Sequence, residues 1–511
     1  MTTLLFPALD SRNTSIALRG ASGDWTYADL QQKVLRVAAA LLGTAGDLGE
    51  ERIAFLLPAS ADYIAVLLGL WRAGGIAVPL NVSAALPELE HALHSAGVTR
   101  LLLSRNTEPA LATALGALCE ALGIRLLRVE DLGTGAESAT RAALPDLSPS
   151  RRALILFTSG TTNKPKGVVS THHNIATQIT TLLAAWHWQQ QDRIPLFLPL
   201  HHIHGIINIL CCALWQGAEL TLFPRFELEP LLQQVAERHY TLFMAVPTIY
   251  VKLVQALEAL PPARRSAVSA GFAAMRLNVS GSAACPVKLF QQWQQLTGQT
   301  LLERYGMTEI GMALSNPYHG ERRAGMVGLP LPGVDVALFD DAGTPVTTDE
   351  QPGEIRIRGN NVFLEYWRNQ AATAASFRDG WFCTGDVAVR EQGYFRILGR
   401  SSIDIIKSGG YKLSALEIEG ALLTHDKIAE CAVVGVEDET WGEAVTACVV
   451  LRPGEQLTLA ELKTWCEGRL SPYKIPKQLR LFTALPRNAM GKVVKAALKQ
   501  PVAGQPSRPS A

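Results

Sequence analysis

The sequence predicts an α/β protein with a large N-terminal domain of doubly wound sheets and a small α+β domain near the C-terminus. Short apolar runs alternate with segments of helical periodicity through residues 52–300, a pattern typical of parallel sheets covered by helices. Glycine pairs and mixed charges then gather at 399–412, ahead of a further apolar strand at 432–436. We therefore expect domains at 1–399 and 400–500, followed by a disordered tail at 501–511.

The composition limits the classes of protein to which the chain can belong. Its 511 residues exceed what one hydrophobic core organises, and 48% hydrophobic with 18% charged residues suits a folded protein. A formal net charge of +1 provides no electrostatic basis for binding nucleic acid or an anionic membrane. The eight cysteines form no Cys-x-x-Cys pair, and neither a signal peptide nor a membrane span is recognisable. We expect a cytoplasmic protein with reduced thiols.

Buried strands of the large domain are predicted wherever a short apolar run is bounded by turn residues. These runs lie at 52–57, 76–80, 153–157, 242–246 and from 276 into a small-residue turn ending at 284. Helices are expected at 61–73, from Ile175 to Trp186, after Pro247 and from Val287 to Leu296. Because open α/β sheets bind ligands beyond the carboxyl ends of their strands, polar residues at those ends are candidates for a site.

The loop that follows the 153–157 strand has the composition of a phosphate-binding loop. It reads Thr-Ser-Gly-Thr-Thr-Asn-Lys-Pro-Lys-Gly over 158–167, which combines hydroxyl donors, bare backbone N–H groups and positive charge. A plain surface turn is the alternative on composition alone. The usual P-loop is excluded, because Lys166 is followed by Gly167 rather than by a helix-opening Ser or Thr.

The order of residues in this loop resembles that of the adenylate-forming superfamily, which includes acyl-CoA synthetases. Four further motifs of that family follow in order: Tyr305-Gly306-Met307-Thr308-Glu309, Thr384-Gly385-Asp386, Gly399-Arg400 and Pro486-Arg487 through Gly491-Lys492. The resemblance covers most of the chain and implies an enzyme that uses ATP and Mg²⁺ to form an acyl-adenylate, then transfers the acyl group to CoA. It also implies that the C-terminal domain is mobile and carries the catalytic lysine.

The resemblance implies roles for individual residues. The catalytic candidates are Lys492, Thr308, Glu309 and His202, and the Mg²⁺ ligands are Glu309 and Thr161. CoA is assigned to Lys407, Gly409 and Gly410, and Asp404 is a candidate hinge residue. The residues assigned to ATP are Thr158, Ser159, Gly160, Thr161, Thr162, Lys166, Ser282, Tyr305, Gly306, Met307, Thr308, Asp386, Arg400 and Lys492.

Arg304 indicates the nature of the acid. Many acyl-CoA synthetases have glycine at this position, and a guanidinium beside the acyl pocket is costly to bury without an anion. A substrate with a second carboxylate supplies that anion, and the stretch from Leu301 to Glu309 resembles malonyl-CoA synthetases, including those that accept methylmalonate. An internal salt bridge to Glu303 or to another acid is the alternative. Other candidates for the acyl pocket are His202, His204, Ser280 and, more weakly, Arg276.

Several alternatives stay open at this point. The histidines at 201, 202 and 204 also suit a metal site, although no acidic or cysteine ligand lies near them in the sequence. The acid can instead be a short monocarboxylate, the acceptor can be a carrier protein or oxygen, or the chain can be an inactive binding relative. The absence of a carrier domain favours free CoA. We expect a monomer or homodimer with small-molecule partners only.

Overall fold

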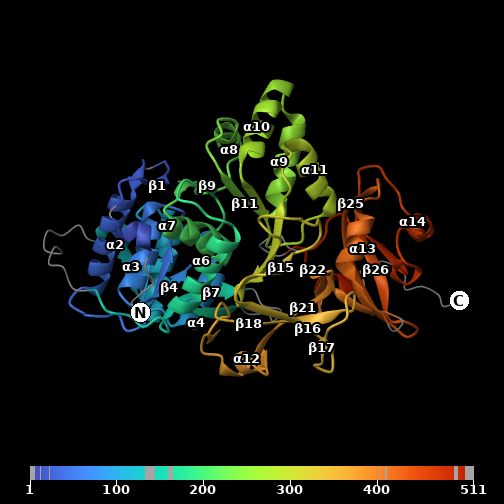
Figure 1. Ribbon diagram of the computed structural model, residues 1–511. Helices are drawn as coiled ribbons and strands as arrows, with labels where there is room; N and C mark the ends of the chain where they lie inside the picture. Colours follow the sequence, from blue (N-terminus) through green and yellow to red (C-terminus); the bar gives the residue numbers. More distant parts are fainter. Residues whose placement is uncertain are drawn as a thin grey trace. The chain divides into compact units, whose positions relative to one another are not determined.

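The computed structural model describes residues 6–11, 13–21, 23–132, 144–158, 165–401, 403–408, 411–487 and 493–500 (Figure 1). It confirms the predicted α/β class. The chain divides into two compact units: unit 1 comprises 1–336 with 357–382, and unit 2 comprises 337–356 with 383–511. The chain passes between them inside strands β16 (Val334–Phe339), β18 (Gly353–Gly359) and β21 (Trp381–Glu391).

Unit 1 contains a seven-stranded sheet in the order β19-β8-β7-β4-β3-β5-β6. Strands β3 to β7 run parallel, and β8 and β19 are added antiparallel at one edge. The apolar runs at 52–57, 76–80 and 153–157 are confirmed as strands because they are buried on both faces of this sheet. The bounds are β3 (Arg52–Leu56), β4 (Ile76–Pro79), β5 (Arg100–Leu103), β6 (Arg125–Arg128), β7 (Arg152–Thr158), β8 (Lys166–Thr171) and β19 (Glu365–Tyr366).

Helices accompany this sheet along the chain. The helix expected from Ile175 to Trp186 is confirmed as α6, which begins at His172 and is capped by Thr171; strand β8, which was not expected, lies between the phosphate loop and this helix. The run from 166 to 171 pairs with β7, which explains the extra strand. The helical bounds are α1 (Pro7–Asp10), α2 (Tyr27–Leu42), α3 (Ala61–Arg72), α4 (Leu86–Ala96), α5 (Pro109–Leu122), the 3-10 turn η1 (Val129–Asp131), α6 (His172–Ala185) and α12 (Gln370–Ala375).

Two further sheets lie within unit 1. One has the order β2-β1-β10-β9, from β1 (Ile16–Arg19), β2 (Trp25–Thr26), β9 (Arg193–Leu196) and β10 (Glu219–Leu222). The other has the order β11-β12-β13-β14-β15, from β11 (Leu242–Ala245), β12 (Leu277–Ser280), β13 (Leu302–Met307), β14 (Gly311–Ser315) and β15 (Leu329–Pro330). Strands β11, β12 and β13 are parallel, as the sequence predicts.

The helices α8 (Leu228–Ala236), α9 (Pro247–Ala259), α10 (Pro262–Ala274) and α11 (Val287–Thr297) gather beside β11 in Figure 1. Rings of Phe243, Tyr250, Phe272 and Trp293 meet edge to face between these helices and the sheet, with centroids 4.7–5.7 Å apart. Such packing gives this face a rigid aromatic core. It leaves the carboxyl ends of β11 to β13 to carry polar residues.

The segment after β9 forms a π-helix, η3 (His204–Cys211), which continues into α7 (Cys212–Gln216). The sequence analysis proposed no helix here. Every residue of η3 is buried. π-Helical turns are rare and occur frequently at functional sites.

Unit 2 is built on a sheet of order β24-β23-β26-β25, with β27 pairing β26. The predicted strand at 432–436 is confirmed inside β25. The domain boundary predicted near residue 400 falls between β22 and β23. That the chain bends there as a hinge stays a prediction. The bounds are β22 (Tyr394–Arg400), β23 (Ile405–Ser408), β24 (Tyr411–Ser414), β25 (Ile428–Asp438), β26 (Gly442–Leu451), β27 (Gln478–Leu481), α13 (Ala415–Leu422), α14 (Leu459–Cys466), η4 (Pro472–Lys474) and α15 (Lys495–Lys499).

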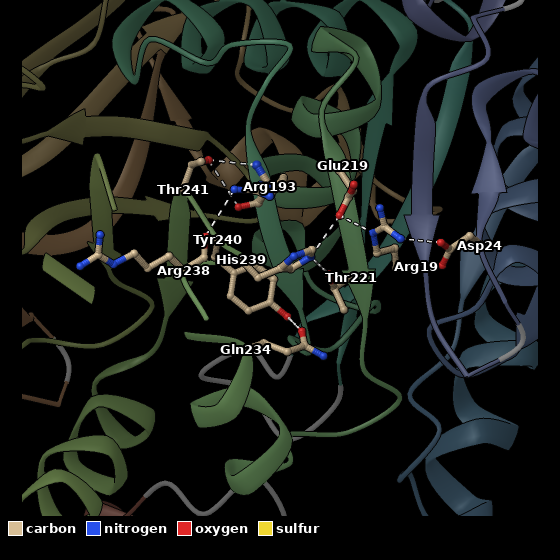
Figure 2. A network of polar contacts seen from close by, with 10 residues as sticks. All are labelled: Arg19, Asp24, Arg193, Glu219, Thr221, Gln234, Arg238, His239, Tyr240 and Thr241. Atoms are coloured by element: carbon tan, nitrogen blue, oxygen red, sulfur yellow. Dashed lines mark hydrogen bonds and ion pairs between the residues drawn. The ribbon is translucent and has the colours of Figure 1, made fainter. Parts of the chain in front are cut away.

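Ionic contacts and hydrogen bonds involve residues at the amino ends of β9, β10, β11 and β12. Figure 2 shows Glu219, at the start of β10, accepting from Arg19 and facing His239. Beside this group, Asp192 accepts from Nε of Arg276 at 2.7 Å and also pairs with its terminal nitrogen. Thr241 donates to Asp192 at 2.8 Å and so links β9 to β11. These contacts lie away from the carboxyl ends of β9 to β12, and carboxyl ends are where open α/β sheets generally bind ligands.

Asp192→Ala should lower the free energy of unfolding by about 3 kcal/mol, because it leaves a largely buried guanidinium without its counter-ion. Asp192 is 2% exposed and the Arg276 side chain 17% exposed. Asp24→Ala is the control, since Asp24 pairs with Arg19 at an exposed position and should cost less than about 1 kcal/mol. Urea denaturation measures both. Equal losses of unfolding free energy in the two variants would contradict the view that the buried pair of Asp192 and Arg276 stabilises these strand ends more than the exposed pair does.

Candidate active site

A cluster of polar side chains lies where η3, β13 and the turn after β12 meet. Ser282 follows β12 with φ = +69°, a left-handed conformation that is unfavourable for a residue other than glycine. Its Oγ lies 3.2 Å from Nδ1 of His204 and 3.3 Å from a terminal nitrogen of Arg304. The structure thus brings together Arg304, His204 and Ser282, all of which the sequence analysis had assigned to the site.

Arg304 is buried without a carboxylate partner among the described residues. It is 4% exposed, Ser282 is its only hydrogen-bond partner among the described residues, and its Nε has no acceptor there. Burial lowers the pKa of the guanidinium to about 10. A charge held in this way carries a desolvation penalty that nothing in the described chain offsets.

Glu303 does not pair with Arg304, so a salt bridge between these two residues is excluded, and no other acid pairs with Arg304 within the described residues. Successive residues of a strand point to opposite faces, and the Glu303 carboxylate instead accepts the backbone N–H of Gly325 at 2.9 Å. Burial raises the pKa of Glu303 to about 7, which matches a carboxyl without a cation beside it. Ser280 pairs in register with Glu303 and shares its face, away from Arg304.

Arg276 lies at the other end of β12. Each of its three nitrogens already donates, two to Asp192 and one to the carbonyl of Trp186. The structure therefore does not bring Arg276 into the cluster around Arg304.

The neighbouring histidines are kept neutral. Burial, followed by the charge of Arg304, holds the pKa of His204 well below its usual range, and burial lowers the pKa of His201 to about 3. The rings of His201 and His202 lie 4.1 Å apart. Within the described residues no three metal-binding side chains gather, so the metal alternative finds no support in this part of the chain.

The Tyr305–Glu309 motif spans the end of β13 and the turn to β14. Gly306 is required because a Cβ there would lie 2.0 Å from the carbonyl oxygen of Gly311. Glu309 is 6% exposed, and its Oε1 accepts from the Tyr366 hydroxyl at 3.0 Å. The ammonium of Lys166 lies 4.9 Å from the centre of the Tyr366 ring. Tyr366, which the sequence analysis missed, therefore contacts two predicted site residues.

The phosphate loop begins at the end of β7, where Thr158 pairs in register with Lys166 of β8. Ser159, Gly160, Thr161 and Thr162 lie outside the described residues, as do Gly409, Gly410 and Lys492.

In unit 2, Asp386 and Arg400 face each other across β21 and β22, with Oδ1 and Nε 3.2 Å apart. Lys407 is exposed on β23. Asp404 is held by Lys495, whose ammonium lies 2.6 Å from Oδ1 and 2.7 Å from a Glu419 oxygen. Burial lowers the pKa of Lys495, but the two carboxylates raise it, and the net shift is upward.

A group of exposed aromatic rings also lies in unit 2 and was missed by the sequence analysis. Tyr411 and Tyr473 stack with centroids 4.5 Å apart and planes 8° from parallel. Lys477 lies 4.7 Å from the centre of the exposed Trp441 ring. Flat exposed rings beside lysines suit a planar, anionic ligand. The placement of Tyr411 directly after the glycine pair was the available signal.

None of the helices in the described part of the chain combines the length and apolar character that a membrane crossing requires.

Arg304→Met should raise the free energy of unfolding by about 1–3 kcal/mol, because it replaces an unpaired buried charge by an apolar chain of similar length. Arg276→Met is the matched control and should lower it by about 3 kcal/mol, since Asp192 then loses its cation. Chemical denaturation of both variants measures the difference. Destabilisation by Arg304→Met as large as that by Arg276→Met would show that Arg304 has a counter-charge.

Comparisons with known proteins agree with this geometry. The AMP-binding enzyme family matches residues 8–367, and the AMP-binding enzyme C-terminal domain matches 417–492. The human protein called malonate–CoA ligase ACSF3, mitochondrial, is 41% identical over 94% of this chain and 89% of its own length. A malonate–CoA ligase of Arabidopsis thaliana is 37% identical over 96% of this chain and 86% of its own.

Solved structures show the same fold. ATP-bound MatB from Rhodopseudomonas palustris superimposes with a TM-score of 0.87 at 32% identity, covering 98% of both chains. A malonyl-CoA ligase in a ternary product complex with methylmalonyl-CoA and AMP gives a TM-score of 0.67 at 36% identity, over 94% of this chain and all of the other. The chain therefore belongs to the AMP-binding enzyme family and has the adenylate-forming fold, with a large N-terminal domain and a small C-terminal domain.

Proposed function

We propose that this protein activates malonate, and also methylmalonate, by forming an acyl-adenylate from the acid and ATP with release of pyrophosphate. The acyl group then passes to the thiol of CoA, and AMP is released. The enzyme is thus an AMP-forming acid–thiol ligase. The malonate–CoA ligase relatives support the substrate, and the buried, uncompensated guanidinium of Arg304 is the observation that carries the proposal.

Arg304 selects the class of acid through charge. A dicarboxylate brings one carboxylate to the reacting phosphate and a second to Arg304, where it offsets the desolvation penalty of the guanidinium. A monocarboxylate with an apolar end would leave the charge uncompensated. Ser282 holds one terminal nitrogen of Arg304, which leaves Nε and the other donors to face the substrate. Because burial holds the pKa of His204 well below its usual range, the imidazole beside them is neutral, and the positive charge comes from Arg304.

The adenylation step requires two anions to approach each other and charge to build up at the α-phosphate. Lys492 is proposed to contact the carboxylate and the α-phosphate, and Lys166 with residues 158–162 to hold the β- and γ-phosphates. Thr308 is proposed to donate to the α-phosphate, and His202 to line the acyl pocket. The buried carboxylate of Glu309, held in place by Tyr366, fits Mg²⁺, with Thr161 as a second candidate ligand. When bound, Mg²⁺ supplies positive charge to the phosphate oxygens.

The remaining assignments rest on the resemblance of the motifs. Tyr305, Gly306 and Met307 are proposed to contact adenine, and Asp386 with Arg400 to bind ribose. Lys407, Gly409 and Gly410 are proposed to face CoA, and the exposed rings of Tyr411, Tyr473 and Trp441 in the same unit support a planar group there. The Ser282 hydroxyl contacts the acyl-side residues, so its part in binding ATP stays a prediction.

Several predictions of the sequence analysis remain proposals. They are the domains at 1–399 and 400–500, mobility of the second domain, the cytoplasmic location and the monomeric or dimeric state. A short-chain monocarboxylate synthetase and a carrier-protein acceptor remain the alternative functions. The absence of an acid partner for Arg304 in the described chain favours a dicarboxylate over a monocarboxylate.

Purified protein with ATP, Mg²⁺ and CoA should turn over malonate and methylmalonate faster than succinate, acetate or butyrate. Arg304→Met should lower kcat/KM for malonate by about 100-fold or more, since it removes a charged bidentate partner. Lys492→Ala should abolish adenylation of every acid. AMP release and thioester mass are the measurements. If acetate or butyrate wins and Arg304→Met has no effect, the fold assignment survives and the dicarboxylate proposal fails.

Tyr366→Phe should lower the rate of adenylation about tenfold without unfolding the protein, because Glu309 loses a hydrogen bond that orients its carboxylate. The rate should recover in part at high Mg²⁺ concentration. Tyr240→Phe is the matched control, since its hydroxyl donates to Gln234 in the group drawn in Figure 2, away from Glu309. An unchanged rate in Tyr366→Phe would remove this tyrosine from the proposed ATP site.

A further inference from the structure

Asn208 is a buried polar residue that the assignments above leave unused. It lies in the middle of η3, is 0% exposed, and neither its amide nitrogen nor its amide oxygen has a hydrogen-bond partner among the described residues. A buried amide without partners is costly, and native proteins rarely retain one without a use for it. Ile206 and Ile207 precede it and Ile209 and Leu210 follow it, so the amide lies within an apolar run of the helix.

Helix geometry directs Asn208 to the same side as His204. The two residues are four positions apart, and in a π-helix, whose hydrogen bonds join residues five apart, this is slightly less than one turn, so both side chains point to about the same side. On this side the His204 ring contacts the Ser282 hydroxyl, which also contacts Arg304. Three buried groups on this side lack acceptors or donors within the described chain: the Asn208 amide, Nε2 of His204 and Nε of Arg304. All three can donate a hydrogen bond, and one is a cation.

We propose that Asn208 is a specificity-determining residue that donates its amide N–H to the distal carboxylate of the dicarboxylate held by Arg304. This inference rests on the proposed function and extends it. A carboxylate has two oxygens that accept about four hydrogen bonds, so Arg304 alone does not satisfy it. His204, with Nδ1 towards the Ser282 hydroxyl, can offer Nε2–H as a further donor. An amide completes this set without adding a negative charge that would compete with the substrate.

Asn278 provides a matched control. It is also 0% exposed, and both atoms of its amide lack partners in the described chain. In the parallel sheet Asn278 pairs with Phe243, so both side chains point to the face where the rings of Tyr250 and Phe272 pack. Arg304 shares the opposite face with Val279, because Val279 pairs with Leu302, two residues before Arg304. Asn278 is thus a buried amide of the same kind that does not face the substrate.

The test compares Asn208→Leu with Asn278→Leu, two nearly isosteric replacements of a buried amide. Steady-state kinetics with malonate, ATP, Mg²⁺ and CoA give kcat/KM, and equilibrium binding of ATP reports whether the nucleotide site is intact. Asn208→Leu should lower kcat/KM for malonate about 10- to 100-fold, with the loss mainly in KM and with ATP binding within about threefold of wild type. Asn278→Leu should keep malonate kcat/KM within about threefold. Asn208→Asp preserves shape and should also lose malonate, because its carboxylate competes for Arg304.

The outcomes separate this inference from the function on which it rests. Malonate kinetics unchanged in Asn208→Leu and Asn208→Asp, or lost equally in Asn278→Leu, overturn the role of Asn208 and leave the proposed function standing. If Asn208→Leu does not fold, Asn208→Asp alone decides by the same criterion. A wild-type protein that does not turn over malonate overturns the proposed function and, with it, this inference.

Discussion

A guanidinium buried without a counter-charge is the constraint on which the acyl site depends. Arg304 lies in β13 just beyond the carboxyl end of β12, and Ser282 is its only hydrogen-bond partner among the described residues. The adjacent Glu303 cannot neutralise it, because strand geometry points the carboxylate to the other face. The charge therefore destabilises the free protein and is available to a bound anion. Ser282, in the turn beside Arg304, adopts a strained left-handed conformation, which is a second unfavourable contribution to the folding free energy at this site.

In unit 1, the polar groups at the amino ends of the strands differ from those at the carboxyl ends in how fully protein partners satisfy them. At the amino ends, Asp192 and Arg276 satisfy each other almost completely, and Glu219 serves Arg19 and His239. These contacts hold the strands in position. Because their donors and acceptors already bind each other, they are not available to a ligand. Near the carboxyl end of β12, by contrast, Nε of Arg304 and Nε2 of His204 have no hydrogen-bond partner within the described residues. This division follows the general rule that open α/β sheets bind ligands beyond the carboxyl ends of their strands, and it gives the site a rigid base.

Much of the fold was predictable because buried parallel strands appear in a sequence as short apolar runs, as at 52–57 and 242–246. The motifs and the departure from glycine at 304 also drew attention to Glu309 and Arg304; the structure shows that both side chains are buried, and their roles stay proposals. Two features were beyond sequence reasoning. Tyr366 contacts Glu309 from 57 positions along the chain, a separation that no local pattern reveals. The π-helix at 204–211 reads as an apolar run that suits several conformations, although Asn208 within it was a visible anomaly.

The most direct test of the central claim is a structure of the protein with malonate and ATP, or with the malonyl-adenylate formed from them. The measurement is the distance from the distal carboxylate oxygens to the nitrogens of Arg304. The account predicts a paired contact of about 2.7–2.9 Å, as is usual for charge-assisted hydrogen bonds. A distal carboxylate that lies in solvent or on another cation, with Arg304 still unpaired, would contradict it.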